Sequence, residues 1–377
     1  MDSPPKRPKV KLYTIISLTL SLLIIALVLY FTISPETVQK LTQVHIHYEF
    51  FLIAILLNIA SWVLWGWRLQ VLSRSLDPTV HISIWEGTKI VIANLFLANI
   101  TPALAGGEPL RIYLLKKDGM TIGGATAAVL GERLIDALCI LILIPFAFFV
   151  FKDRLDNPAL AGGLTIGVVL FVLFVILFLY ALKNPEKIKR LLISLSERFS
   201  RMRKQQEDTT ESTKLVSFIS REVDSFHASM LFFVGEGKKA FFIVSLLTVA
   251  FWAVGFMIPS MLLMGLGLPP YFIMSYAAQL LLLVIIMMPT TPGSSGIAEI
   301  SVSGLYSVII GASYGYLLGV FVLLFRLITY HMNLIAGAIF QHRIFNDPHV
   351  RHGLPAGNGG GRGIVRVREI AIRVRVD

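Results

Sequence analysis

The chain has 377 residues, of which 55% are hydrophobic and only 15% are charged, and its mean hydropathy is +0.73. A composition this apolar excludes an ordinary soluble domain and is typical of a polytopic membrane protein. The net charge of +11 does not indicate nucleic-acid binding, because no binding module is recognisable and basic residues in a membrane protein first mark cytoplasmic loops. The one cysteine, Cys139, excludes an internal disulfide and a cysteine-based metal cluster.

The first apolar segment runs from about Leu12 to Ile33 and follows a basic amino terminus. It is long enough to cross a membrane and too long for the core of a signal peptide, so we expect a retained first helix with its amino terminus inside. A second run, about Phe50 to Trp67, is followed by Arg68 and Arg74, which predicts a return to the cytoplasm. This run ends in three tryptophans, which favour the membrane interface: Trp62, Trp65 and Trp67.

A helix-breaking segment follows the next apolar run, Ile82 to Ala98. Between Asn99 and Arg111 the chain reads Asn-Ile-Thr-Pro-Ala-Leu-Ala-Gly-Gly-Glu-Pro-Leu-Arg, in which proline removes backbone N–H groups and glycine permits tight turns. Basic residues lie on both sides, with Lys116 and Lys117 after it. The pattern predicts a re-entrant helical hairpin that enters and leaves the membrane on the cytoplasmic side.

Three further segments are expected to cross the membrane completely. These are Ile122 to Phe151, Leu164 to Leu182 and Ala240 to Met264. The second leads into the most charged part of the chain, Lys183 to Lys239, whose helical patterning predicts a solvated amphipathic hairpin on the cytoplasmic face. The third ends at a Gly-Leu-Gly-Leu-Pro-Pro turn at residues 265–270.

A second broken segment lies between Tyr271 to Met288 and Ile300 to Ile310, and Tyr316 to Phe340 then returns to the cytoplasm. It repeats the first segment's pattern, because Thr-Pro, small residues and a glutamate recur in both. The threonines, prolines and glycines expected to shape the two hairpins are Thr101, Pro102, Gly106, Gly107, Thr291, Pro292, Gly293 and Gly296. Broken backbone survives at membrane depth only when it is packed in protein or lines a wet cavity, and two such segments in corresponding halves point to a transport site.

We therefore predict an all-α polytopic membrane protein with about six full spans and two inverted re-entrant hairpins. Eight full spans are the alternative, because the whole length of each hairpin would just reach across; ordinary loops between spanning helices are a further reading. Residues 1–343 form the predicted membrane domain, and both termini are expected in the cytoplasm. Residues 344–377 form a basic tail that we expect to be disordered or to attach to anionic lipid through its arginines.

Charged residues inside a membrane are costly and usually mark function. The candidates for substrate binding and translocation are Glu108, Arg111, Glu132, Arg133, Asp136, Glu299 and Arg326. Glu108 and Arg111 lie three residues apart at a helix start, where an internal ion pair and direct ligand contact are equally consistent. Glu132 and Asp136 share a helix face and could bind a cation, relay a proton or pair with Arg111 or Arg326.

We favour a buried ion network that leaves one arginine available for the phosphate of an anionic head group, because guanidinium groups suit bidentate phosphate binding. His331 is expected to be a hydrogen-bonded packing residue, since no second His or Cys stands at ligand spacing. No metal and no cofactor is therefore expected.

Three motifs, in order, carry a resemblance to a known family. Residues 94–111, the run Ala-Ala-Val-Leu-Gly-Glu-Arg-Leu-Ile-Asp at 127–136, and Pro-Thr-Thr-Pro-Gly-Ser-Ser-Gly-Ile-Ala-Glu at 289–299 together resemble the lysylphosphatidylglycerol synthase transmembrane-region family, the flippase-like integral membrane proteins. The resemblance covers about residues 10–343. It implies a fold with two re-entrant hairpins that moves a lipid head group between leaflets, and it places six residues beside the lipid path: Glu108, Arg111, Glu132, Arg133, Asp136 and Glu299.

Full synthases carry a soluble domain that attaches the amino acid after the membrane region. This chain ends without room for one, so aminoacyl transfer is not implied. The sequence predicts an inner-membrane protein that moves an anionic phospholipid or a polyprenyl-phosphate-linked lipid between leaflets, downhill or coupled to ions, because no nucleotide-binding motif is present. Its partners would be membrane lipids, a second copy of the chain or a separate lipid-modifying enzyme. The alternatives are a lipid-linked glycosyl or aminoacyl transferase and a non-transporting envelope scaffold.

Overall fold

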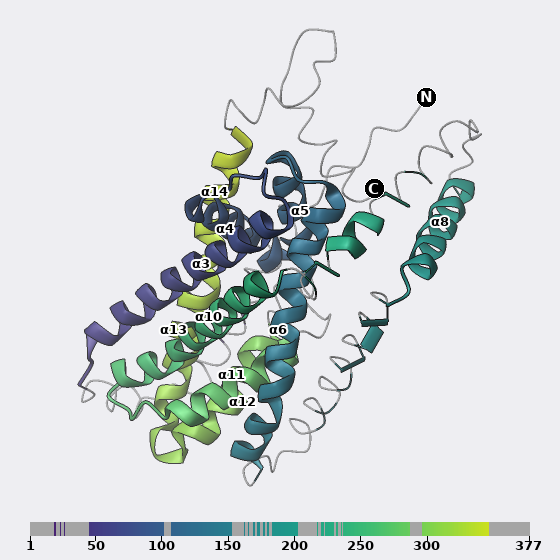
Figure 1. The fold of residues 1–377 in the computed structure, drawn as a ribbon. Helices are drawn as coiled ribbons and strands as arrows, with labels where there is room; N and C mark the ends of the chain where they lie inside the picture. The colour runs from purple at the N-terminus through teal and green to yellow at the C-terminus, as the bar shows by residue number, and fades with distance from the viewer. Residues whose placement is uncertain are drawn as a thin grey trace, which may run out of the picture.

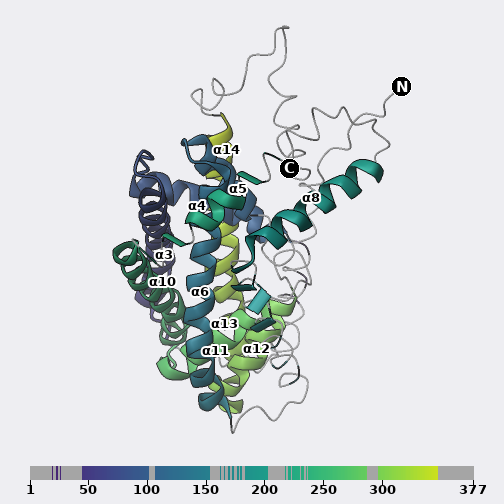
Figure 2. The ribbon, with the colours of Figure 1, turned by 45° about the vertical axis from the view of Figure 1, so that its right-hand side comes forward.

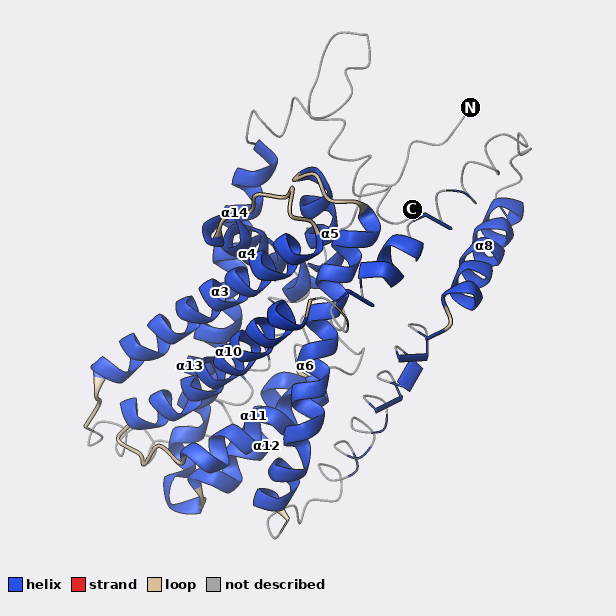
Figure 3. Cartoon of the chain, in the orientation of Figure 1, coloured by secondary structure: helices blue, strands red, loops and turns tan. Residues whose placement is uncertain are grey.

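The computed structural model describes residues 45–101, 107–152, 183–202, 223–229, 237–286 and 296–346, with a few single residues between these ranges. The regular structure of these residues is helical, and no strand occurs among them (Figure 3). The prediction of an all-α polytopic membrane protein is confirmed. The expected spans at 12–33 and 164–182, and the expected tail, lie largely outside the described residues and stay predictions.

Four helices in the described part of the chain are long and apolar enough to cross a membrane. They are α3 (Tyr48–Leu76), α6 (Ile122–Phe151), α10 (Lys238–Gly265) and a composite helix over Ala312–Phe340. Each contains 28 to 30 residues. At 1.5 Å per residue such a helix is about 42–45 Å long, which exceeds the roughly 30 Å thickness of the hydrocarbon layer.

The composite helix changes its winding in the middle. It consists of the 3₁₀ turn η1 (Ala312–Leu317), α13 (Leu318–Arg326), a π-helical turn η2 (Leu327–His331) and α14 (Met332–Asn346). A π turn changes the usual pairing of backbone carbonyl groups, and at membrane depth any carbonyl without its helical partner needs another one inside the protein. Asn58 of α3 donates to the Ile328 carbonyl oxygen at 3.1 Å and thereby ties α3 to η2.

Two pairs of short helices lie toward opposite ends of this bundle (Figures 1 and 2). One pair is α4 (Ile84–Ile100) and α5 (Gly107–Lys117), and the other is α11 (Phe272–Ile286) and α12 (Ile297–Ile310). None of the four reaches the roughly 20 residues that a single crossing requires. The pairs lie where the hairpins were expected in the sequence; that they re-enter the membrane, and on which sides they begin and end, stays a prediction.

The short helices begin at specific capping residues. Ser83 and Glu86 cap α4 reciprocally: the Ser83 N–H donates to the Glu86 carboxylate at 2.7 Å, and the Glu86 N–H donates to the Ser83 hydroxyl at 3.2 Å. At the start of α12, Gly296 adopts φ +95°, which favours glycine, and its N–H donates to Glu299 Oε2 at 2.6 Å. Thr101 ends α4 in an extended conformation. Five of the expected hairpin-shaping residues lie outside the described residues: Pro102, Gly106, Thr291, Pro292 and Gly293.

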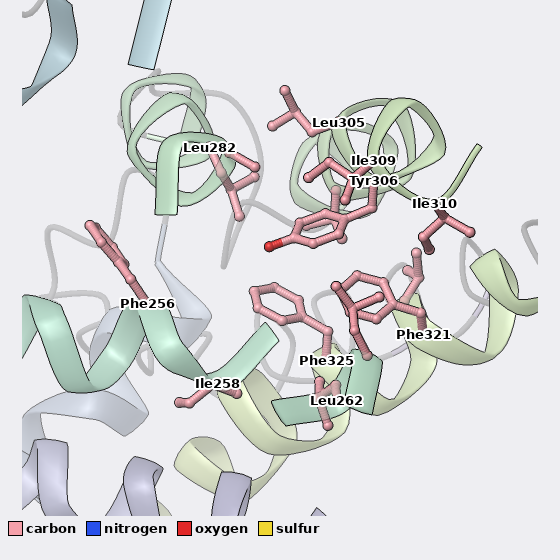
Figure 4. Close-up of a cluster of buried hydrophobic side chains, with 14 of the residues drawn as sticks. Phe256, Ile258, Leu262, Leu282, Leu305, Tyr306, Ile309, Ile310, Phe321 and Phe325 are labelled. Atoms are coloured by element: carbon pink, nitrogen blue, oxygen red, sulfur yellow. The ribbon is translucent and has the colours of Figure 1, made fainter. Parts of the chain in front are cut away.

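Small residues allow the helices to approach closely. A Cβ at Gly66 of α3 would overlap Thr88 of α4, and one at Gly337 of α14 would lie 2.6 Å from the Phe96 nitrogen of α4. Such contacts are the usual way in which membrane helices pack without a hydrophobic driving force between them. Figure 4 shows the apolar cluster at the other end of the bundle, where the rings of Tyr306 and Phe321 are 4.4 Å apart.

The amphipathic helix α8 (Pro185–Met202) lies apart from the bundle in Figures 1 and 2. Lys189 of α8 donates to Asp224 at 2.7 Å and to Glu186 at 2.8 Å. These two bonds raise the pKa of Lys189. That this region faces the cytoplasm stays a prediction.

Candidate functional site

Arg68 of α3 is at the centre of the site. Its side chain is fully buried, and it binds Asp136 of α6 through both terminal nitrogens: Nη1 donates to Oδ1 at 2.6 Å and Nη2 to Oδ2 at 3.2 Å. Nη2 also lies 2.9 Å from Glu132 Oε1, and Nη1 donates to the Thr248 hydroxyl of α10 at 3.1 Å. Four polar contacts therefore join three of the long helices around one guanidinium group.

Glu132 links this centre to the first short helix pair. Its Oε2 accepts from Arg111 Nη2 of α5 at 2.7 Å, and its Oε1 accepts from the indole nitrogen of Trp65 at 2.6 Å. Both Glu132 and Arg111 are fully buried. Of the alternatives considered for Glu132, the pairing with Arg111 is present, and Trp65 of α3 donates to the same carboxylate.

Glu108 and Arg133 form the outer part of the site. Arg133 donates to Glu108 Oε1 from Nε at 3.0 Å and approaches the same oxygen with Nη2 at 2.9 Å. Arg133 Nη1 lies 3.6 Å from Asp136 Oδ2. The pair considered within α5, Glu108 with Arg111, is replaced by pairs between α5 and α6, because α6 brings an oppositely charged partner to each residue.

The site joins three guanidinium groups to three carboxylates, and we call these six residues the arginine–carboxylate network: Arg68, Arg111, Arg133, Glu108, Glu132 and Asp136. Aromatic rings enclose it. Arg111 and Arg133 lie 5.3 Å and 5.4 Å from the ring centre of Trp65, and Arg68 lies 5.0 Å from that of Phe251. The network is formally neutral, which makes its burial among apolar helices tolerable.

Arg111 keeps unused hydrogen-bonding capacity. Its Nε and Nη1 are buried and have no hydrogen-bond partner in the described part of the protein. A buried donor without a partner costs about 1–3 kcal/mol, so native proteins rarely tolerate it unless a water, ion or ligand completes the bond.

The remaining candidates, Glu299 and Arg326, form a second pair. Arg326 Nε donates to Glu299 Oε1 at 2.9 Å, and the guanidinium lies 4.0 Å from the ring centre of Tyr330. Tyr330 in turn donates to the Asn99 carbonyl oxygen of α4 at 3.4 Å. His331 Nδ1 lies 3.0 Å from the Arg326 carbonyl oxygen, which agrees with its expected hydrogen-bonded packing role.

Two interpretations of the α3 sequence were wrong. Arg68 is buried inside the helix bundle and does not mark a cytoplasmic flank, because α3 continues to Leu76 and ends well beyond it. Trp62 and Trp65 are also buried, and each donates its indole N–H to a partner inside the bundle, whereas Trp67 is 41% exposed. The missed signal was the absence of a helix-breaking residue between Trp67 and Leu76.

Within the described residues, no group of three or more His, Cys, Asp or Glu side chains is placed to hold a metal ion. The arginine–carboxylate network consists of paired charges, and the Thr248 hydroxyl and the Trp65 indole form hydrogen bonds with it. Its chemistry suits the binding of a charged polar group inside an apolar bundle.

Comparison with known proteins agrees with the motifs. A protein from Archaeoglobus fulgidus described as a UPF0104 membrane protein is 33% identical over 328 residues, which cover 86% of this chain and 94% of the relative. A UPF0104 membrane protein from Methanothermobacter thermautotrophicus is 25% identical over 265 residues, covering 67% and 72% of the two chains. No solved structure matches the chain. The family model described as the lysylphosphatidylglycerol synthase TM region matches residues 15–337, and the chain therefore belongs to that family.

Proposed function

We propose that this membrane protein moves anionic lipids between the leaflets of the cell membrane, and that Arg111 binds the lipid phosphate during the passage. The single observation that supports this most is the state of Arg111. It is fully buried, it pairs with Glu132 through one nitrogen, and two further nitrogens are unpartnered in the described residues. Phosphate oxygens are strong acceptors with the geometry that a guanidinium group favours.

The carboxylates have a second task in this proposal. Because the network is formally neutral, an arriving phosphate adds a negative charge to a buried cluster. The cost is lowest if a carboxylate takes up a proton or gives up an arginine while the lipid is bound. Glu132 is the residue placed for such an exchange, since it contacts both Arg68 and Arg111.

The two short helix pairs supply the path. Half-helix ends near the middle of a membrane are a recurrent feature of transport sites, and broken backbone there must line protein or a wet cavity. We therefore infer that α4–α5 and α11–α12 are the inverted hairpins between which the head group crosses, with Glu299 and Arg326 on the second side.

A vesicle assay tests this function. The purified protein is reconstituted into liposomes that carry fluorescent phosphatidylglycerol in both leaflets, and the fraction bleached by dithionite is followed. Wild-type protein should make nearly all of the label accessible, while empty vesicles should protect the inner leaflet. Arg111→Ala should slow the movement by about tenfold or more, because a charge-assisted hydrogen bond contributes about 1.5–3 kcal/mol and each 1.36 kcal/mol is tenfold in rate.

Arg74→Ala is the matched control, because Arg74 is an exposed arginine on α3. Arg111→Ala leaves Glu132 bound to Arg68 and Trp65, so the variant should still fold, which its unfolding temperature verifies. Movement at wild-type rate in folded Arg111→Ala would refute the assignment of Arg111. No movement of any lipid by folded wild-type protein would refute the transport proposal itself.

A further inference from the structure

Two more buried polar groups at the start of α5 lack partners in the described residues. Asn94 of α4 is 1% exposed, and neither its carboxamide oxygen nor its nitrogen has a hydrogen-bond partner in the described residues. Glu108 uses Oε1 to bind Arg133, but its Oε2 is buried and likewise unpartnered. A buried polar group without a partner needs a physical explanation, and a bound ligand, ion or water is one that fits here.

These groups lie along the first turn of α5. A Cβ at Gly107 would collide with the carboxamide oxygen of Asn94, so glycine is what allows the Asn94 side chain to lie directly against α5. Gly107 and Arg111 are one helical turn apart and share a face, and Glu108 is three residues before Arg111. The helix start adds a partial positive charge that favours an anion.

The unpartnered atoms include both donors and acceptors. Arg111 and the Asn94 nitrogen offer N–H groups, which a phosphate can satisfy. The Asn94 oxygen and Glu108 Oε2 can only accept, and an ionised phosphodiester has no hydrogen to give them. Phosphate alone would therefore leave two buried acceptors without partners, at a cost that a hydroxyl or ammonium group on the same ligand would remove.

On the basis of the transport function proposed above, we infer that this α4–α5 site selects phospholipids whose head group carries a hydrogen-bond donor, a hydroxyl or a primary amine, beside the phosphate. Arg111 binds the phosphate, and Asn94 with Glu108 binds the donor. Asn94 is the specificity-determining residue, because it offers an acceptor and a donor at one point.

Two matched lipid pairs test the inference, and each pair has equal head-group charge. Phosphatidylglycerol has hydroxyl donors that phosphatidylmethanol lacks, and phosphatidylethanolamine has N–H donors that phosphatidylcholine lacks. Binding of each lipid, with identical acyl chains, to the purified full-length protein is measured by native mass spectrometry, and transport is measured in parallel by the vesicle assay. We expect at least one donor-bearing lipid to bind about tenfold more tightly than its donor-free counterpart.

Asn94→Leu should abolish this preference and bring the ratio close to one. Because the substitution removes two unsatisfied polar atoms from a buried position, it should leave the unfolding temperature of the lipid-free protein unchanged or raise it. If Asn94 had only a structural role, Asn94→Leu would lower the unfolding temperature and leave the lipid preference unchanged. Asn94→Ser retains a donor and an acceptor and should restore part of the preference, and Asn184→Leu, outside the site, should change nothing.

Each outcome is decisive. Preference for phosphatidylglycerol alone identifies a hydroxyl as the donor, and preference for phosphatidylethanolamine alone identifies an amine. Equal binding within both pairs would overturn the inference, even if transport is observed. A preference that survives in both Asn94→Leu and Glu108→Gln would place the selective site elsewhere. Selective binding without any lipid movement would refute the transport proposal and leave this inference intact.

Discussion

A single buried arginine, Arg68, joins α3 to α6 and α10. Its guanidinium contacts Asp136, Glu132 and Thr248, and all of these partners are nearly or fully buried. A buried ion pair adds less to stability than its geometry suggests, because both charges lose their hydration. Removing one partner of the pair is strongly destabilising, because the remaining buried charge has lost its hydration and no longer has an opposite charge beside it.

Arg68→Ala should therefore lower the free energy of unfolding by about 3–5 kcal/mol, because it leaves Asp136 buried without its bidentate partner. The measurement is denaturant or thermal unfolding of the detergent-solubilised protein, followed by tryptophan fluorescence. Arg74→Ala, on the exposed side of the same helix, should change stability by less than about 0.5 kcal/mol.

A double variant tests whether the stability lost in Arg68→Ala comes from the unpaired charge or from lost packing. Arg68→Met with Asp136→Leu removes both charges of one pair and leaves Glu132 bound to Arg111, so it should recover most of the lost stability. If Arg68→Ala proved as stable as Arg74→Ala, the buried pairing of Arg68 would be contradicted.

The site residues differ in how far the sequence reveals them. Charges inside apolar runs, such as Glu132 and Asp136, stand out because they are expensive there. Arg68 and Asn94 do not stand out, since the first looks like a basic flank and the second like one polar residue in a helix. Their roles depend on what α6, α10 and α5 bring next to them, and no local pattern carries that information.

Among the elements, the crossing of α3 and α4 depends on glycine. A Cβ at Gly66 would overlap the Thr88 backbone, and one at Gly87 would overlap the Gly66 carbonyl oxygen. Gly255 of α10 provides the contrast, because a Cβ there would have no atom within 4 Å. Gly66 and Gly255 are both glycines inside long helices, and they differ only in what surrounds them.

Gly66→Ala should lower the free energy of unfolding by about 1–3 kcal/mol, because α3 and α4 would have to separate. Gly255→Ala should raise it by roughly 0.5–1 kcal/mol, since alanine favours a helix and nothing opposes the new methyl group. Unfolding curves of the two variants beside wild type make the comparison. Equal effects at both positions would mean that the close crossing does not exist.

Element boundaries follow from the sequence where one physical rule dominates. The span at Ile122–Phe151 was predicted with the bounds that α6 shows, although three charged residues lie inside its apolar run, and Thr121 caps the start of the helix. The winding of the last helix was not predicted. Its π turn at Leu327–His331 depends on Asn58 of α3, which lies 270 residues away from its partner Ile328.

At the scale of the whole molecule, the short helix pairs either turn back within the membrane or cross it. α4 packs against α5, and α11 packs against α12, as two helices do when the chain folds back on itself. Figures 1 and 2 place the two pairs toward opposite ends of the long helices. A pair stacked end to end would instead extend along the bundle, so the arrangement favours the hairpins over eight full spans.

The single native cysteine makes this testable. On a Cys139→Ser background, exposed single cysteines are placed on both sides of each short pair: Pro78→Cys and Asp118→Cys for α4–α5, and Pro269→Cys and Ser313→Cys for α11–α12. Labelling by a membrane-impermeant maleimide is compared in right-side-out and inverted vesicles. Re-entrant hairpins predict that the two cysteines of a pair react from the same side, and that the two pairs react from opposite sides.

Eight full spans would place the two members of each pair on opposite sides, because a crossing separates its ends by the thickness of the bilayer. Labelling of all four cysteines from one side would contradict both topologies, since three expected crossings separate Asp118 from Pro269 and place them on opposite sides.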